Sequence, residues 1–189
     1  GFKAPSLYQL YGMFGANPDL KPERSQSFEV GASGLILQSK MEWRAIYFNR
    51  TINDVIVYAN GVNKNLDKQD DHGLEVEATV HAGKRVTVRA WYTYVTGQVT
   101  TNTTNGDTAF YNLVRRPKHA VGFNVSYRAT DKLQLSTFVQ AVGKRTDLYF
   151  DMNTFTNQPA NLKAYVLLDL SAQYQANKNF SFFATARNV

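Results

Sequence analysis

The sequence predicts an all-β protein, an antiparallel transmembrane β-barrel, and three observations lead to this fold class. Apolar and polar residues alternate with period two in eight separate runs. The connections between the runs are alternately short and long. Aromatic residues gather near the ends of the runs. These patterns are typical of strands that face lipid on one side and water on the other.

The alternating runs are clearest in the middle of the chain. Leu74, Val76 and Val80 alternate with Glu75 and Glu77, which gives one apolar and one polar face. The longer runs exceed the roughly 5–6 residues of a globular strand and approach the about 9–11 that cross a bilayer. The alternation predicts eight strands, of which the first two fit less cleanly, around residues 28–36, 43–47, 74–81, 86–94, 121–127, 133–141, 166–174 and 180–187.

The connections and the aromatic residues support a membrane barrel. Short turns at one end and long loops at the other are characteristic of outer-membrane barrels. The short connections are 38–40, 81–84, 128–132 and 175–179, and the long ones are 59–71, 97–115 and 144–163. Amphipathic rings suit the membrane–water interface. The aromatic residues that we expect there are Tyr92, Tyr94, Tyr127, Tyr165, Tyr174 and Phe180.

Composition excludes several other classes of protein. Apolar residues make up 43% of the chain, so the composition is not that of a disordered protein. The net charge is +6, but basic residues are scattered singly, which argues against a nucleic-acid interface. Without cysteine there is no disulfide and no thiolate metal site. We also expect no helix with good capping residues.

A soluble β-sandwich that binds carbohydrate is one alternative, because its outer face would also be polar. Strand length and loop asymmetry argue against it. The charged residues of the polar face would each cost several kcal/mol in hydrocarbon, so in a membrane they must line a water-filled lumen. These residues include Glu75, Glu77, Arg89, Asp169 and Arg187.

The first thirty residues carry a specific motif. Residues 2–7 read Phe-Lys-Ala-Pro-Ser-Leu, and residues 17–23 read Asn-Pro-Asp-Leu-Lys-Pro-Glu, followed by Ser25, Glu29 and Gly31. Pro18 and Pro22 belong outside a hydrogen-bonded ladder. The motif resembles a signature in the barrel of TonB-dependent outer-membrane receptors, where a loop leads into a descending strand.

Further segments match this family in the same order. They are Gly73 to Glu77, Arg115 to His119, Tyr165 to Leu170 and Arg187 to Val189, so the resemblance covers essentially the whole chain. Residues 142–147 and the loop at 149–151 are most similar to the vitamin B12 (cobalamin) receptor branch. Siderophore and colicin receptors have comparable loops, so ferric siderophores remain an alternative ligand.

The resemblance implies more than the residues show by themselves. It implies a barrel of roughly 22 strands around a plug, in the outer membrane of a Gram-negative bacterium and in contact with lipopolysaccharide. Residues 1–189 would form a C-terminal portion of that barrel, without the plug and the last strand. The function implied is energy-dependent uptake of a scarce, bulky ligand by a monomer coupled to the TonB protein, without enzymatic chemistry or a cofactor.

We expect ligand contacts from aromatic and amide side chains of the long loops, which can stack on a bulky ligand or hydrogen-bond to it. The candidates are Tyr8, Tyr11, Tyr58, Asn60, Tyr111, Tyr149 and Phe150. Packing between loops is the alternative role for each. The three histidines lack metal-ligand spacing, and we expect no metal site at the acidic residues Asp70, Asp71, Asp147 and Asp151 either.

A small, closed eight-stranded barrel that serves as an adhesin or structural anchor is the alternative of a different class. Such a barrel has a lumen just wide enough for side chains. The inward set here includes small residues, namely Gly122, Ser126, Ser136 and Ser171. Small inward residues favour one wall of a wider barrel.

Overall fold

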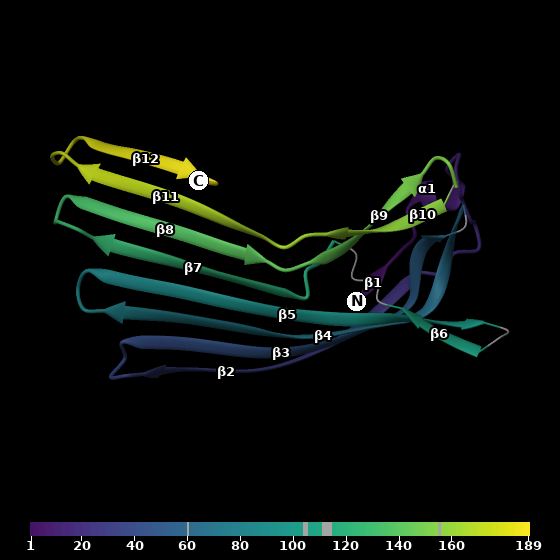
Figure 1. The fold of residues 1–189 in the computed structure, drawn as a ribbon. Helices are drawn as coiled ribbons and strands as arrows, with labels where there is room; N and C mark the ends of the chain where they lie inside the picture. The colour runs from purple at the N-terminus through teal and green to yellow at the C-terminus, as the bar shows by residue number, and fades with distance from the viewer. Residues whose placement is uncertain (60, 104–105, 111–114, 155) are drawn as a thin grey trace.

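The computed structural model describes the chain except residues 60, 104–105, 111–114 and 155. It is a long, curved antiparallel sheet (Figure 1). The main strands are β2 (Glu23–Ile36), β3 (Met41–Ala59), β4 (Val62–Ala82), β5 (Val86–Thr103), β7 (His119–Arg128), β8 (Leu133–Val142), β11 (Tyr165–Gln175) and β12 (Ser181–Arg187). The eight predicted strands are therefore confirmed, and neighbours in sequence are neighbours in the sheet.

Smaller elements complete the fold. Strand β1 (Phe2–Lys3) pairs with β2, and β6 (Gly106–Phe110) pairs with β5. Strands β9 (Arg145–Asp151) and β10 (Thr156–Leu162) form a separate hairpin. Among the described residues, no helix is long and apolar enough to cross a membrane. The single described helix, α1, is short and spans Leu7–Tyr11.

The pairing register of the strands places apolar and polar side chains on opposite faces of the sheet. Directly paired residues share a face, and one apolar row crosses seven strands through Ala32, Ala45, Val76, Tyr92, Val121, Ala141 and Val166. The adjacent row on the other face runs through Ser33, Arg44, Glu77, Trp91, Gly122, Gln140 and Leu167. The predicted apolar and polar faces are thus continuous surfaces.

The apolar face is exposed over much of its area, which a protein in water would avoid. Val30 is 55% exposed, Val166 63% and Phe182 62%. Buried apolar residues instead gather beyond this face, where Val55, Leu66 and Val99 pack together with Ile52 and Val57. Hydrocarbon must therefore cover the wall that the sheet presents.

The short turns are confirmed, but the long connections differ from the prediction. Residues 62–71 belong to β4, which pairs with β3 up to Ala59 and Val62. The other two long connections contain β6 and the β9–β10 hairpin. Apolar alternation detects a strand only where one face meets lipid. Beyond the bilayer neither face meets lipid, and the strands continue without that pattern.

The aromatic residues also need one correction. Tyr92, Tyr94 and Tyr174 lie on the apolar face, as an interfacial position requires. Tyr165 pairs with Val142 and shares the polar face with Asp169, so it is not part of the lipid-facing belt. The reason is that side chains alternate between the two faces along β11, and its first residue, Tyr165, points to the polar face.

Residues 1–189 produced alone are expected not to fold cooperatively in detergent. The sheet ends on β12 at one edge and on β2, with the two-residue β1, at the other. Such edges leave backbone groups that a bilayer cannot hydrate. Heat-modifiable gel migration and thermal circular dichroism measure this. A compact species with a cooperative transition would contradict the expectation.

Candidate functional site

All long hairpins and the N-terminal helix lie at one end of the sheet (Figure 1). The prediction of no well-capped helix is wrong. Ser6 Oγ accepts from the Gln9 amide at 3.2 Å, and Gln9 Oε1 accepts from the Ser6 amide at 2.8 Å. This reciprocal capping box stabilises a single turn that has too few residues for apolar periodicity. It presents Tyr8 and Tyr11 to solvent.

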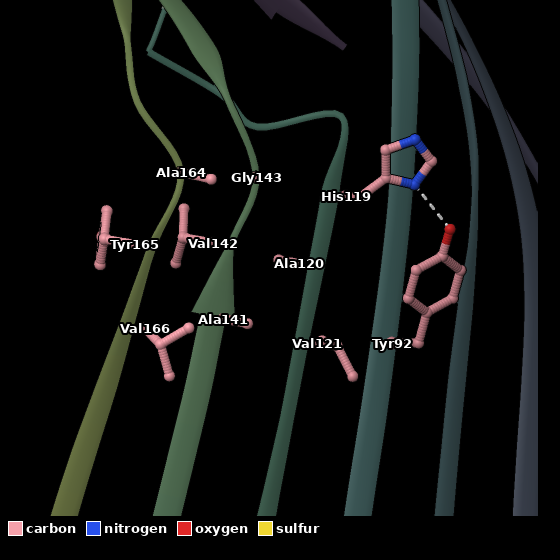
Figure 2. A pocket seen from close by; sticks show the side chains of 10 residues that line it. All are labelled: Tyr92, His119, Ala120, Val121, Ala141, Val142, Gly143, Ala164, Tyr165 and Val166. Atoms are coloured by element: carbon pink, nitrogen blue, oxygen red, sulfur yellow. Dashed lines mark hydrogen bonds between the residues drawn. The ribbon is translucent and has the colours of Figure 1, made fainter.

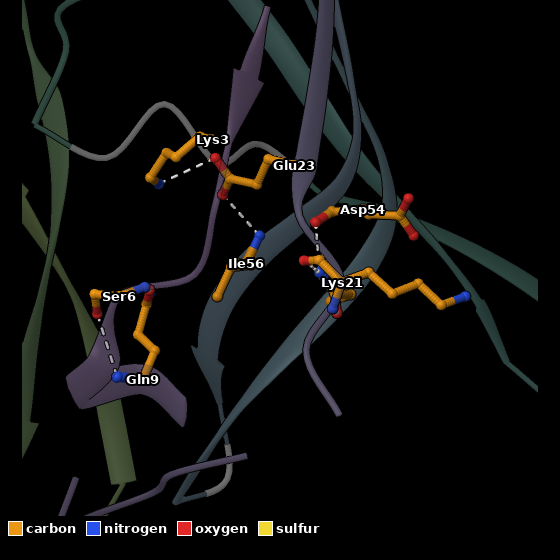
Figure 3. A network of polar contacts seen from close by, with 8 residues as sticks. Lys3, Ser6, Gln9, Lys21, Glu23, Asp54 and Ile56 are labelled. Carbon is orange, nitrogen blue, oxygen red and sulfur yellow. Dashed lines mark hydrogen bonds and ion pairs between the residues drawn. The ribbon is translucent and has the colours of Figure 1, made fainter. Parts of the chain in front are cut away.

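The two halves of the N-terminal motif are joined by an ionic clamp (Figure 3). Lys3 Nζ lies 3.0 Å from Glu23 Oε2. The other carboxylate oxygen of Glu23 accepts from the Ile56 amide at 2.8 Å. Glu23 is buried, so both of its oxygens are paired within the protein. The motif thus anchors the N-terminal segment to β3.

Two asparagines of β4 hold the proline-containing part of the motif. Asn63 Nδ2 donates to the Gly15 carbonyl at 2.7 Å, and Asn17 Nδ2 donates to the Asn63 carbonyl at 3.0 Å. Asn65 Oδ1 accepts from the Lys21 amide at 2.8 Å, and its Nδ2 donates to the Lys21 carbonyl at 2.9 Å. Because an amide side chain both donates and accepts, it can imitate a strand neighbour.

A buried ion pair lies on the polar face where the strands leave the apolar region. The guanidinium of Arg50 on β3 binds the carboxylate of Asp71 on β4, which is 1% exposed. Gln69 Nε2 donates to both carboxylate oxygens, at 2.9 and 3.0 Å. Gly97 of β5 lies opposite Asp71, and any Cβ there would collide with the carboxylate. The network therefore needs glycine at this position.

The neighbouring Asp70 lies on the other face, beyond the last lipid-facing residues. Burial on its own raises the pKa of Asp70. Hydrogen bonds from Lys68 and from Thr51 Oγ1, together with the Lys68 charge, outweigh burial and lower this pKa below its usual value. The Lys68 Nζ to Asp70 Oδ2 distance is 2.9 Å. Asp70 is thus engaged by Lys68 of its own strand and by Thr51 of β3.

The polar face itself carries charged and aromatic groups. A hollow of about 280 Å³ is lined by Arg44, Glu75, Glu77 and Trp91 among others. Arg89 Nε lies 3.4 Å from Glu77 Oε1. The Trp91 indole lies over Gly122, where an added Cβ would approach Cε2 to 2.6 Å. These groups give the polar face charged and hydrogen-bonding side chains.

The structure brings those predicted ligand-binding residues that it describes to one end of the sheet. Tyr8, Tyr11 and Tyr149 are exposed. Tyr58 is 48% exposed and lies against Gly15. Phe150 lies in β9. Asn60 and Tyr111 lie outside the described residues. The ligand-binding role of all seven residues stays a prediction.

Sequence reasoning missed the side chains that organise this end. In the sequence, Glu23 stands only at the end of the 17–23 motif, and Asn63 and Asn65 fall within the predicted long connection 59–71. No signal in the sequence identifies Asn63 and Asn65 as strand residues, because asparagine is depleted in strands. Over the part of the chain that the structure describes, no cluster of three His, Asp or Glu residues could hold a metal ion.

An alternating wall with one lipid-facing side, short turns at one end and long hairpins at the other defines an outer-membrane β-barrel protein. The family model "TonB dependent receptor-like, beta-barrel" matches residues 1–189. The chain belongs to this family, which is one of receptors of the Gram-negative outer membrane and not of enzymes.

The sequence is similar to curated vitamin B12 transporters. The vitamin B12 transporter BtuB of Vibrio cholerae serotype O1 is 31% identical over 193 residues, covering 100% of this chain and 29% of the transporter. BtuB of Photobacterium profundum is 30% identical over 199 residues, covering 100% of this chain and 30% of that transporter. The chain thus spans less than a third of these relatives. The predicted similarity to the cobalamin receptor branch is confirmed.

Solved structures share the fold at lower identity. The ferripyoverdine receptor of the Pseudomonas aeruginosa outer membrane has a TM-score of 0.73 and 20% identity, covering 90% of this chain and 24% of that one. A mutant of the ferric enterobactin receptor of the same species has a TM-score of 0.73 and 20% identity, covering 100% of this chain and 31% of that one. The copper transporter OprC has a TM-score of 0.73 and 15% identity, and the match covers 100% of this chain and 30% of that one.

Replacing Gly97 by alanine is expected to destabilise the receptor by about 1–3 kcal/mol, because the new methyl group displaces the Asp71 carboxylate. Gly34→Ala is the matched control, since a Cβ there meets only the edge of Trp43, at 3.3 Å. Urea unfolding of the intact receptor in lipid vesicles measures the free energy of unfolding of both variants. Equal effects of the two substitutions would contradict the role of Gly97.

Replacing Glu23 by alanine is expected to loosen residues 1–22, because Lys3 and the Ile56 amide both lose their acceptor. An unpaired buried donor costs about 1–3 kcal/mol. Limited proteolysis of the intact receptor should then cut this segment about ten-fold faster. Glu29→Ala, on an exposed residue of the same strand, is the control. Unchanged cleavage of the Glu23 variant would exclude the clamp.

Proposed function

We propose that this chain is part of the barrel wall of an outer-membrane receptor that takes up a scarce, bulky ligand. The observation that carries the proposal is the division of the sheet. A lipid-facing wall ends at Tyr92 and Tyr94, and the strands then continue into water as hairpins with exposed tyrosines. Such hairpins are suited to capture a ligand above the lumen.

We further propose that residues 1–189 are a C-terminal portion of a larger barrel, with a plug and a last strand supplied outside these residues. The span of less than a third of the curated relatives supports this. So does the open sheet, in which β2 and β12 lie at opposite edges. Uptake would draw energy from the TonB protein through the plug. A closed, eight-stranded anchor would instead require β2 and β12 to pair.

The ligand that we propose first is cobalamin, because the curated relatives that cover the whole chain are vitamin B12 transporters at about 30% identity. Ferric siderophores are the second candidate. The solved ferripyoverdine and ferric enterobactin receptors support them through the fold alone. Isothermal titration of the intact receptor with cyanocobalamin, ferric pyoverdine and ferric enterobactin tests the choice. Binding of none of these ligands would overturn the proposal.

A Tyr8→Ala/Tyr11→Ala receptor is expected to bind its ligand about ten-fold more weakly or worse, because exposed aromatic rings supply stacking area at an interface. Tyr127→Ala is the control, since Tyr127 lies beside a short turn at the opposite end. Titration with the preferred ligand measures the affinities. Unchanged affinity in the double variant would remove Tyr8 and Tyr11 from the site.

A further inference from the structure

An uncharged stretch of the N-terminal segment is exposed to water. Residues 4–18 contain no Asp, Glu, Lys, Arg or His. Their large apolar and aromatic side chains are nevertheless exposed, and Met13 is exposed by 86%. The exposed side chains are those of Leu7, Tyr8, Tyr11, Met13 and Phe14. Exposed apolar side chains that gather in one place mark a contact surface.

Two glycines of this stretch lie directly against tyrosine rings. An added Cβ at Gly12 would approach Tyr8 Cδ2 to 2.7 Å, and the Gly12 amide donates to the Tyr8 carbonyl at 2.8 Å. Gly15 has a φ of +65°, which favours glycine, and an added Cβ there would collide with the Tyr58 ring of the β3–β4 hairpin. Backbone thus supports one side of each ring, while Tyr8 and Tyr58 both remain exposed.

Met13 and Phe14 lie in the chain between these two glycines. We call Tyr8, Met13, Phe14 and Tyr58 the apolar platform. The backbone beneath the platform is held in place, because the capping box fixes α1 and Asn63 Nδ2 donates to the Gly15 carbonyl at 2.7 Å. A surface that is ordered before binding loses little conformational entropy when a partner arrives. The platform is therefore preorganised for contact.

The platform lies beyond the membrane. Tyr92 Oη lies 2.7 Å from His119 Nδ1, and such amphipathic rings mark the headgroup level (Figure 2). His119 belongs to the same row as Leu74 of β4. From Leu74 the strand continues outward to Asn63, which binds the N-terminal segment. Lipid therefore does not cover the platform, and its partner comes from water.

The lack of charge indicates which ligand chemistry the platform suits. Lys3, just before the uncharged stretch, is already paired with Glu23. The platform therefore offers no cation to an anionic chelate and no carboxylate to a cationic ligand. Removing apolar area from water is the favourable contribution that remains. Rings that are fixed from behind also provide stacking area at low entropic cost.

We infer that the apolar platform binds an uncharged, apolar face of the ligand that is taken up, and that Met13 and Phe14 are specificity-determining residues. The ligand class that fits is a neutral ring system with methyl or methylene groups at its rim. The inference rests on the proposed uptake function. Of the ligands proposed there, it favours cyanocobalamin, which has no net charge, over anionic ferric siderophores.

Methionine oxidation in the intact receptor tests the contact directly. The receptor, in a mild detergent, is treated with hydrogen peroxide with and without saturating cyanocobalamin, and peptide mass spectrometry measures the sulfoxide. Met13 should be oxidised about ten-fold more slowly when the ligand is bound, because oxidation follows exposure. Met41, which begins β3 beside a short turn at the opposite end, is the control and should not change.

Two results of the oxidation experiment would overturn the inference. One is slow oxidation of Met13 in the free receptor, which would show that another part of the receptor covers the platform. The other is an equal rate for Met13 with and without bound cyanocobalamin.

Charges of opposite sign at Met13 test the ligand class. Met13→Lys and Met13→Glu should each weaken cyanocobalamin binding about ten-fold, because either charge loses water against a neutral ligand. Ala82→Lys and Ala82→Glu, on an exposed residue at the short turn after β4, are the matched controls and should leave the affinity unchanged. Unchanged affinity in both Met13 variants would contradict the inference. Tighter binding in Met13→Lys with weaker binding in Met13→Glu would indicate an anionic ligand and contradict it too.

Titration separates failure of the inference from failure of the proposed function. Heat-modifiable migration first confirms that each variant is folded. A receptor that binds only an anionic ferric siderophore overturns the inference and leaves the uptake function in place. A receptor that binds none of the three ligands overturns the proposed function itself.

Discussion

Backbone hydrogen bonding in a medium without water is the constraint on which the whole structure depends. Each N–H and C=O group inside a bilayer needs a partner from the protein, and a continuous antiparallel ladder supplies it. The ladder fixes the side-chain period at two, so every strand has one face toward lipid and one toward the interior. The row from Ala32 to Val166 and the row from Ser33 to Leu167 are the two consequences of that one rule.

The same strands serve different purposes on either side of the headgroups. Within the bilayer, their stability comes from the ladder and from lipid against the apolar face. Beyond it, water competes for every backbone group, and other interactions have to hold the strands together. The small cluster of Val55, Leu66 and Val99 and the Arg50–Asp71 pair lie in this part. The Glu23 clamp and the Asn63 and Asn65 hydrogen bonds attach the N-terminal segment to it.

The membrane part of the fold could be predicted from sequence, because lipid on one side imposes a hydropathy pattern on each strand. Residues 74–80 and 166–174 show this pattern and lie where it places them. The outer parts of β3 and β4 could not be predicted in this way, because no lipid imposes an alternation on residues 62–71, where Asn63, Gln69 and Asp71 are buried as well as Leu66. Helix α1 was missed for a related reason, since a capping box and five residues give no periodicity.

The candidate site was predicted only as a set of residues at one end. Exposed tyrosines can be identified from sequence, but their convergence depends on hairpin geometry that hydropathy does not encode. A hollow of about 880 Å³ whose lining includes three lysines is another example. Lys118, Lys144 and Lys163 are far apart in sequence, and only the pairing of β7, β8 and β11 brings their segments together. Along the sequence itself the cations are only scattered.

Cysteine scanning along β7 in whole outer membranes tests the central claim most directly, because the chain contains no cysteine of its own. Each residue from Val121 to Ser126 is replaced in turn and exposed to a lipid-soluble or a water-soluble maleimide. The barrel account predicts that Val121, Phe123 and Val125 react with the lipid-soluble probe and that Asn124 and Ser126 react with the water-soluble one, whereas position 122 is covered by the Trp91 indole. Labelling without this alternation, or a protein recovered in the aqueous fraction, would contradict the account.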